Sequence, residues 1–360
     1  MSLFKSLSLQ QTADLIAAVG SVQTILAQGE MGIGKSSILK MLQDRPELKN
    51  HMFCYVDITT KDVGDFVVPK IRTVDGVDVC SFIPNEEFGF HFKKPVVIML
   101  DELGKAKGGV MNACLRLMQE RQLGTYELHP DSIVFATTNL AVEGIGDNVP
   151  PHARNRVTQV RVAKPTAEEW MSYAISRGIN HTVIATVREY PDMLASFEDY
   201  EHPQQNTYVF DPREVRLSFV TPRSLEKAGY IVERTAILGR DVMAHALKGT
   251  VGEKAMHNIL TMVDMDSQLA DWDDVIKSPT TVPVPTNGAA ACMMVSKAVR
   301  RITKDSISAW MEFLPRLSKE AQGLFARSVM IDQCPTRAVA ATNPKFAKWC
   351  ADNNYLFARR

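Results

Sequence analysis

Short, uniformly apolar runs alternate with amphipathic segments through the first part of the chain. Between the apolar runs, segments such as residues 109–121 place apolar side chains on one face at helical spacing. Uniformly apolar runs of this length are typical of strands that are covered on both faces of a sheet. Strands that alternate with helices predict an α/β fold with a parallel sheet. The four expected strands cover residues 24–28, 53–58, 95–100 and 133–138.

One segment departs from this scheme. Residues 67–82 contain two runs of alternating polarity on either side of Asp75-Gly76, which is a favoured two-residue hairpin turn. We therefore expect a protruding β-hairpin near residues 67–82, inserted in an α/β domain that covers residues 1–165.

After residue 165 the pattern becomes mainly helical. We expect a helical domain over residues 166–277, with a polar insertion near residues 190–212 that is rich in Pro, Asp, Glu and Gln. The proline-rich stretch 278–288 favours an extended linker, so residues 278–360 are expected to form a linker and a C-terminal helical region. Amphipathic spacing over residues 305–327 is interpreted as helix packing rather than as a site.

Composition narrows the class of protein. Lys+Arg and Asp+Glu both total 41, so the formal net charge is zero and the chain lacks the overall basic character of a nucleic-acid binder. The six cysteines show no CxxC or zinc spacing, which indicates reduced thiols. No run approaches the roughly 20 apolar residues of a membrane span, and the first residues lack the apolar core of a signal peptide. We expect a cytoplasmic protein.

The strongest motif lies between the first expected strand and the helix after it. The segment GEMGIGKS, residues 29–36, fits G-x-x-x-x-G-K-[ST] in the strand-loop-helix context that this pattern requires. Backbone N–H groups of such a loop wrap phosphates, Lys35 can meet the β- and γ-phosphates, and Ser36 can ligate Mg²⁺. ATP and Mg²⁺ are therefore the expected cofactors. The expected nucleotide contacts are Gly29, Glu30, Met31, Gly32, Ile33, Gly34, Lys35, Ser36 and Ser37.

Polar residues follow the third and fourth expected strands. Asp101 and Glu102 end the third strand, and Asn139 ends the fourth, so all three should face the crevice where the phosphates lie. Asp101 can hold the magnesium, and Glu102 can orient and deprotonate the attacking water. Asn139 can hold that water or touch the γ-phosphate. Taken singly, each residue also fits an ordinary turn or helix cap.

In order and spacing, these motifs resemble those of an AAA+ ATPase, and more closely the MoxR-like group with a helix 2 β-hairpin insert. The resemblance covers about residues 5–275. It implies a P-loop NTPase core with a parallel sheet, followed by an α-helical lid and a C-terminal helical block. Residues 29–36 would be Walker A, Asp101 and Glu102 Walker B, and Asn139 sensor 1.

The resemblance also implies two arginines that act on the γ-phosphate. The segment PPHARNRV offers Arg156 in the place of the family's arginine finger, with Arg154 as the alternative. Arg223, at the start of a predicted helix, resembles sensor 2 of the lid, and a plain helix start with Pro222 near its first turn is equally compatible. An arginine finger stabilises charge on the transferring phosphoryl group, and hydrolysis depends on assembly when a neighbouring subunit supplies it.

Three functions follow from this resemblance. The first is a MoxR-like motor or chaperone that hydrolyses ATP in a ring, expected to be a hexamer, and remodels a protein partner such as one with a von Willebrand factor A domain. The second is a nucleic-acid machine, such as a helicase loader or DNA translocase, against which the zero net charge counts. The third is a non-hydrolysing, nucleotide-gated scaffold, which would not need Glu102.

Overall fold

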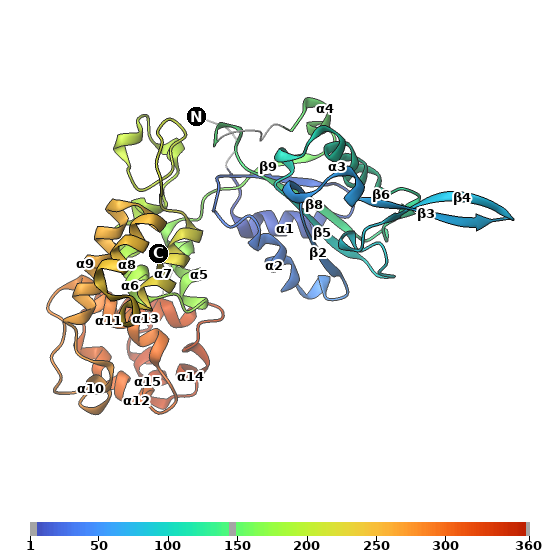
Figure 1. Cartoon of the computed structure of the whole chain (residues 1–360). Helices are drawn as coiled ribbons and strands as arrows, with labels where there is room; N and C mark the ends of the chain where they lie inside the picture. Colours follow the sequence, from blue (N-terminus) through green and yellow to red (C-terminus); the bar gives the residue numbers. More distant parts are fainter. Residues whose placement is uncertain (1–5, 144–148, 358–360) are drawn as a thin grey trace. The chain divides into compact units, whose positions relative to one another are not determined.

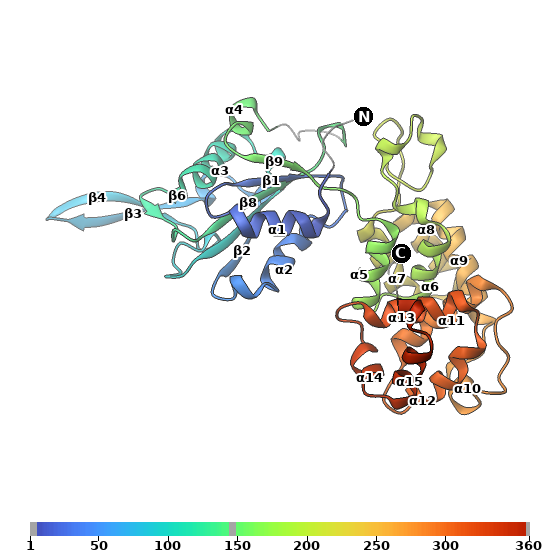
Figure 2. The ribbon, with the colours of Figure 1, turned by 180° about the vertical axis from the view of Figure 1, so that it is seen from behind.

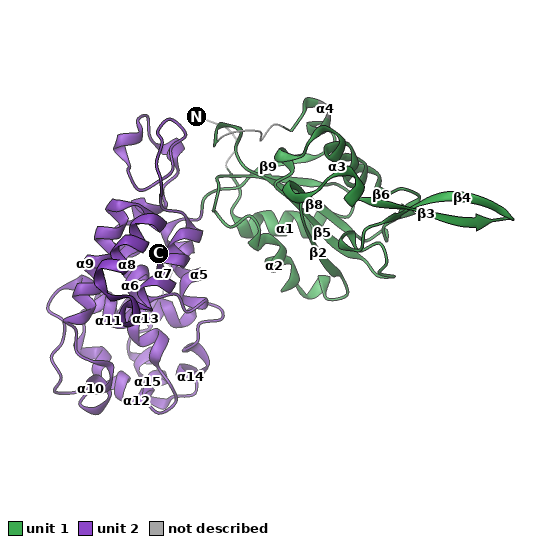
Figure 3. Cartoon of the chain, in the orientation of Figure 1, with its two compact units in different colours: residues 1–164 green, residues 165–360 purple. Residues whose placement is uncertain are grey.

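The computed structural model describes residues 6–143 and 149–357 of the chain. The chain divides into two compact units, residues 1–164 and residues 165–360, which Figure 3 colours separately. Unit 1 contains the large β-sheet, and unit 2 is built of helices. Within the described ranges, no helix is long and apolar enough to cross a membrane.

Unit 1 is built on a five-stranded parallel sheet in the order β2-β5-β8-β1-β9. This sheet, together with the helical region that follows it, confirms the predicted fold class. Strand β9 was not predicted, because its sequence TQVR contains a single apolar residue and lies at the sheet edge. The strands are β1 (Ile25–Gln28), β2 (Met52–Asp57), β5 (Val96–Asp101), β8 (Ile133–Thr138) and β9 (Thr158–Arg161).

Helices cover both faces of this sheet (Figures 1 and 2). Successive side chains of a strand point to opposite faces, so each central strand contributes to two core layers. Along β5, Val97 and Met99 pack in the layer of α1 and α2, whereas Ile98 and Leu100 pack in the layer of α3. This double burial explains the uniformly apolar strand sequence. The helices of unit 1 are α1 (Leu9–Val19), α2 (Ser37–Gln43), α3 (Gly108–Glu120) and α4 (Pro151–Arg154).

A two-stranded antiparallel hairpin extends from unit 1 (Figure 1). Strands β3 (Val67–Val74) and β4 (Val77–Pro84) pair in register from Val67 opposite Pro84 to Val74 opposite Val77. The turn residues Asp75 and Gly76 have φ of 51° and 77°, which is the left-handed backbone that a two-residue hairpin turn requires. A second, smaller ribbon joins β6 (Gln122–Leu123) to β7 (Tyr126–Glu127).

Most of the β3–β4 hairpin is exposed on both faces, including its apolar side chains. Directly opposed residues of an antiparallel pair share a face, so Lys70 and Arg72 lie on the same face as Val74 and Val77. Cys80 on β4 is also exposed. The large apolar side chains that the hairpin exposes are Val68, Ile71, Val74, Val77, Val79 and Phe82.

Unit 2 consists of helices that run to the C-terminal end of the described chain. Helix α11 packs against α6, α9 and α13, so residues after 288 belong to the same compact unit as residues 165–277. The first helices are α5 (Ala167–Ser176), α6 (His181–Glu189), α7 (Pro222–Val232), α8 (Thr235–Val251, kinked at Gly239) and α9 (Glu253–Ser267). The later helices are α10 (Trp272–Lys277), α11 (Gly288–Arg301), α12 (Ile307–Phe313), α13 (Lys319–Met330), α14 (Arg337–Ala341) and α15 (Pro344–Asp352).

The amphipathic pattern over residues 305–327 forms two helices instead of one. Helix α12 ends at Phe313, and α13 begins at Lys319, because Pro315 between them has no N–H group to continue the helix. Trp310 of α12 is fully buried, with its ring 5.9 Å from that of Trp272 and 5.7 Å from that of Phe325. These residues form the core of the C-terminal helices, as the packing interpretation requires.

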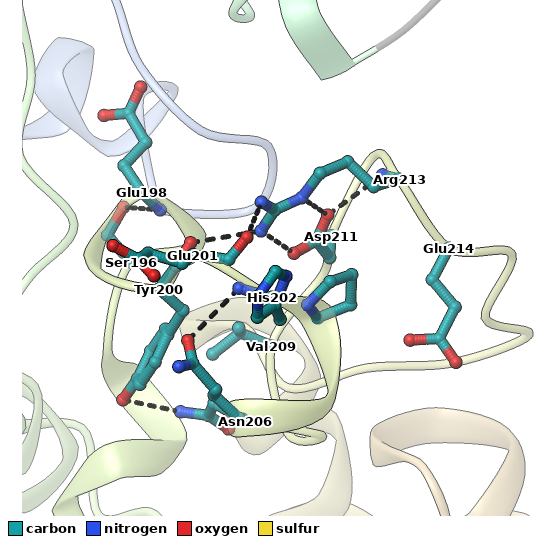
Figure 4. A network of polar contacts seen from close by, with 12 residues as sticks. Ser196, Glu198, Tyr200, Glu201, His202, Asn206, Val209, Asp211, Arg213 and Glu214 are labelled. Atoms are coloured by element: carbon teal, nitrogen blue, oxygen red, sulfur yellow. Dashed lines mark hydrogen bonds and ion pairs between the residues drawn. The ribbon is translucent and has the colours of Figure 1, made fainter.

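The segment between α6 and α7 has only short 3-10 turns and is held by polar contacts (Figure 4). Arg213 donates from Nε and Nη2 to Asp211 at 2.8 and 2.5 Å, and from Nη2 to the Tyr200 carbonyl at 3.1 Å. Arg216 donates to the Val209 and Pro203 carbonyls at 2.6 and 2.7 Å. Because irregular backbone leaves carbonyls unpaired, two guanidinium groups with five donors each stabilise this segment. We call Asp211, Arg213, Arg216 and their partners the insertion network.

Candidate active site

At two positions, the loop between β1 and α2 has a backbone conformation that only glycine adopts easily. Gly32 and Gly34 have φ of 71° and 100°, in the left-handed region where a side chain is strained. Gly29 is constrained by contact instead, since a Cβ on it would lie 2.9 Å from the Val162 carbonyl oxygen. The glycines of the motif are therefore required by the loop's shape and by its close packing on the end of β9.

Lys35 folds back into this loop and connects it to the end of β8. Its side chain is buried, with 8% of the residue exposed, and Nζ donates to the carbonyls of Gly29 and Glu30 at 2.7 and 2.8 Å. A third hydrogen bond of 2.8 Å runs from Nζ to Oδ1 of Asn139. These three acceptors are neutral oxygens, and negatively charged phosphate oxygens are stronger acceptors for an ammonium group. The structure thus brings the predicted lysine and asparagine into direct contact.

The strand order explains how residues so far apart in sequence meet. Strand β8 lies between β1, which leads into the glycine-rich loop, and β5, which ends in the acids. All three strands are parallel, so their carboxyl ends lie at one edge of the sheet. Asn139 therefore stands between Lys35 on one side and Asp101 with Glu102 on the other.

Asp101 is held by two hydroxyl groups that the sequence did not indicate. The Tyr55 hydroxyl on β2 donates to Oδ2 at 2.8 Å, and the Thr137 hydroxyl on β8 donates to Oδ1. Burial, together with the carboxylate of Asp101, raises the pKa of Tyr55, so the phenol remains a donor. These two hydrogen bonds restrict the orientation of the Asp101 carboxylate. Ser36, the other expected magnesium ligand, is exposed and makes no capping hydrogen bond with its side chain.

Glu102 has a left-handed backbone, with φ of 56° and ψ of 39°. For a residue other than glycine this conformation costs about 1 kcal/mol or more, and such strain is concentrated at functional sites. The Glu102 side chain is 33% exposed and forms an ion pair with Lys105 on the following turn. This left-handed residue ends β5 and precedes the 3-10 helix Leu103–Lys105.

Glu143 was not among the predicted site residues, yet it contacts the glycine-rich loop. Its carboxylate oxygens accept a hydrogen bond from the Met31 N–H at 3.2 and 3.0 Å. Burial raises the pKa of Glu143 to about 7, with the charge of Glu30 adding to the rise and that of Lys35 opposing it. The Glu30 carboxylate itself lies 3.8 Å from Nζ of Lys164. We call Lys35, Asn139, Glu143 and Glu30 the phosphate-loop cluster.

The three candidate arginines differ in their surroundings. Arg154, the last residue of α4, and Arg156, in the turn before β9, are both exposed, but Arg154 donates from Nε to the Val149 carbonyl at 2.7 Å. Arg223 lies in the first turn of α7 in unit 2, after the cap that Thr221 provides, and is exposed. Arg154 thus supports its own loop, and Arg156 presents its guanidinium to the surface.

Comparison with known proteins does not assign this chain to a family. No family model matches the chain, and no curated protein matches it. A RuvB mutant from Thermotoga maritima is 13% identical with a TM-score of 0.38, over 84% of this chain and 90% of that one. NtrX from Brucella abortus in complex with ATP is 14% identical with a TM-score of 0.33, over 97% of this chain and 69% of that one. Because both scores are below 0.5, the functional assignment rests on the site itself.

Proposed function

We propose that this chain is a magnesium-dependent ATPase of the AAA+ type. The observation that carries the proposal is the 2.8 Å hydrogen bond between Lys35 and Asn139, with Asp101 and Glu102 on the strand beside Asn139. A glycine-rich loop, a buried ammonium group, a polar amide and two acids converge at one sheet edge. That combination is what binding and hydrolysis of a nucleoside triphosphate require.

The residues present fit a nucleotide with Mg²⁺. The left-handed Gly32 and Gly34 turn the loop so that its N–H groups can converge on phosphate, and Ser36 and the oriented Asp101 are oxygen ligands of the kind magnesium prefers. Bound Mg²⁺ would neutralise charge that develops on the β- and γ-phosphate oxygens. Ser36 and Asp101 are the residues that would hold it.

Each side chain then has a distinct task. Lys35 exchanges its carbonyl partners for phosphate oxygens, which leaves the Asn139 amide in contact with the γ-phosphate or the attacking water. Glu102 orients that water and accepts its proton, for which the carboxylate must leave the ion pair with Lys105. Water attacks the γ-phosphorus, the bond to the β-γ bridging oxygen breaks, and the products are ADP and phosphate.

Arg156 is our candidate for the arginine finger, and Arg223 for sensor 2. Both arginines are exposed, but Arg154 already donates to Val149, which favours Arg156 as the group that reaches a neighbouring subunit. In this proposal the chain assembles as a hexameric ring. The γ-phosphate bound by one subunit is contacted by Arg223 of that subunit's own helical lid, and Arg156 from a neighbouring subunit stabilises charge on the same phosphoryl group.

Within this class we favour a MoxR-like motor that remodels a protein partner, such as one with a von Willebrand factor A domain. The exposed apolar hairpin of unit 1 supports a role in contacting protein, since exposed apolar patches mark interaction sites. The absence of net positive charge disfavours the nucleic-acid machine. The strained backbone at Glu102 disfavours the non-hydrolysing scaffold, which has no use for that acid.

Glu102→Gln is the variant that tests this proposal. ATP turnover should fall by about 10²–10⁴-fold, because the base is lost, while ATP binding is retained because the loop is unchanged. Glu127→Gln, an exposed acid on β7, is the matched control and should hydrolyse ATP normally. Normal turnover in Glu102→Gln would refute Glu102 as the base, and a wild type that binds ATP without hydrolysing it would support the scaffold. Stimulation of the wild type by DNA would support the nucleic-acid machine.

Arg156→Ala tests the ring arrangement. Turnover should fall by about 10³-fold, whereas Arg154→Ala should change turnover of the folded protein only severalfold. Mixing Arg156→Ala with Lys35→Ala subunits should restore part of the activity, since the second variant supplies the arginine that the first lacks. Mixtures that stay as inactive as either variant alone would refute supply of the arginine by a neighbour.

A further inference from the structure

The segment after β8 is attached to the phosphate loop at two points. Asn139 contacts Lys35, and Glu143, at the end of the 3-10 helix Ala141–Glu143, holds the N–H of Met31. The first contact joins two groups to which the proposed mechanism gives tasks. The second places a carboxylate in the loop that is to receive the phosphates.

Among the residues that the structure describes, the charged groups that act on Glu143 belong to the phosphate loop. They are the ammonium of Lys35, which favours the ionised form, and the carboxylate of Glu30, which opposes it. The ammonium of Lys164 lies 3.8 Å from the Glu30 carboxylate and partly compensates its negative charge. Nucleotide phosphates would add several negative charges to this surrounding, and Lys35 would turn from its present partners towards them. The ionised state of Glu143 is then disfavoured further.

We propose that Glu143 is a positioning residue of the phosphate loop that takes up a proton from solvent when nucleotide phosphates bind. This inference rests on the proposed function, because it assumes that the loop binds phosphates. The proton is transferred from water or buffer to a carboxylate oxygen, and no other bond is formed or broken. The neutral carboxyl group keeps a carbonyl oxygen for the Met31 N–H and gains an O–H donor, which a phosphate oxygen can accept.

Near neutral pH, both protonation states of Glu143 are accessible, since burial raises its pKa to about 7. Binding that takes up a proton weakens as pH rises, because protonation then has to occur against a lower proton concentration. Above about pH 7, nucleotide affinity should fall by up to about tenfold per pH unit from this group alone. Below that pH, Glu143 is already neutral and its contribution disappears.

The test is calorimetry of ADP binding in two buffers with different ionisation enthalpies, which counts the protons taken up. At about pH 8, the wild type should take up a large fraction of one proton more than Glu143→Gln. Glu143→Gln should bind ADP about tenfold more tightly than the wild type at about pH 8, and equally at about pH 6. Titration of ADP itself is the same in both proteins and cancels.

Glu120→Gln is the matched control for charge. Glu120 ends α3, where its carboxylate pairs with Arg116, and this variant should match the wild type in proton uptake. Equal uptake and equal affinity in the wild type and Glu143→Gln would overturn the proposed role of Glu143 while the ATPase proposal stands. Failure of the wild type to bind ADP would instead overturn the ATPase proposal, so the two failures are distinguishable.

A second measurement needs no variant. In protein labelled with ¹⁵N-methionine, the Met31 amide resonance should titrate near the pKa of its acceptor, Glu143, without ADP. With saturating ADP the midpoint should move upward by about one unit or more. A midpoint that ADP leaves unchanged, or moves downward, contradicts the inference even if Glu143→Gln fails to fold.

Discussion

The phosphate-loop cluster and the insertion network use similar residues in different ways. Both contain a partly or fully buried acid, a basic side chain and backbone carbonyls. In the insertion network, Arg213 pairs directly with the buried carboxylate of Asp211 and holds its pKa below the usual range. In the phosphate-loop cluster, Lys35 donates three hydrogen bonds to neutral oxygens, and the nearby acid Glu143 has a raised pKa.

The difference separates structural charge from functional charge. A guanidinium that already holds a carboxylate and several carbonyls has little to gain from a ligand, so the insertion network fixes its segment. An ammonium held by neutral oxygens gains when phosphate arrives, so the phosphate-loop cluster is arranged for exchange. The first should therefore determine stability, and the second should determine binding.

Lys35→Ala should have the largest effect on ADP binding, because it removes the central side chain of the phosphate-loop cluster. ADP affinity should fall on the order of 100-fold, since each hydrogen bond to a charged group contributes about 1.5–3 kcal/mol, and ATP turnover should be lost. Lys40→Ala, at an exposed lysine on α2, the helix that follows the loop, is the control and should bind ADP as the wild type does. Fluorescent ADP titration measures both. Normal ADP binding by Lys35→Ala would contradict the claim that the phosphate-loop cluster determines nucleotide binding.

Asp211→Asn should show the opposite behaviour, with reduced thermal stability and unchanged ADP affinity. Because the folded-state pKa of Asp211 is depressed, its stabilising contribution is complete above the ordinary Asp pKa and is lost as pH falls through the folded-state value. The difference in melting temperature between wild type and variant should therefore disappear in acid. Asp305→Asn, the same change at an exposed acid of unit 2 outside the insertion network, is the control for melting curves. A pH-independent deficit would show that the charge of Asp211 is not responsible.

Tyr55→Phe should give the smallest effect and sharpens the comparison within the active site. Removing the hydroxyl leaves Asp101 with one hydroxyl donor, Thr137. The lost hydrogen bond, which orients the carboxylate, contributes about 1 kcal/mol, so turnover at limiting Mg²⁺ should fall about fivefold. Excess Mg²⁺ should restore most of the rate. ATPase assays across magnesium concentrations provide the measurement. A loss that Mg²⁺ does not relieve would point away from Asp101 as a magnesium ligand.

The site residues that lie in contiguous motifs could be predicted from the sequence, whereas contacts between residues far apart in the sequence could not. The glycine-rich loop and Lys35 occur in one segment, and Asn139 was indicated by its place after an apolar strand. The contact of Glu143 with Met31 spans 112 positions, and the hydroxyl of Tyr55 reaches Asp101 from the neighbouring strand. Such pairs depend on strand order and on an irregular turn, neither of which a local pattern encodes.

The fold was predictable where both faces of a strand are buried. β5 and β8 have uniformly apolar sequences for that reason, whereas the edge strand β9 has a mostly polar sequence and gave no signal. Residues 305–327 were correctly assigned to packing, but the break at Pro315 was overlooked although proline is a local signal. The arginines remain predictions, since their action depends on neighbouring subunits and on the lid.

The exposed hairpin has a practical consequence through its cysteine. Of the six cysteines in the chain, five are buried or partly buried, and burial raises their pKa values and so suppresses the reactive thiolate. Cys80 is exposed on β4. A thiol-directed fluorophore should therefore attach selectively to the hairpin of the unaltered protein. Its emission would then report when another molecule covers that hairpin during the proposed nucleotide cycle.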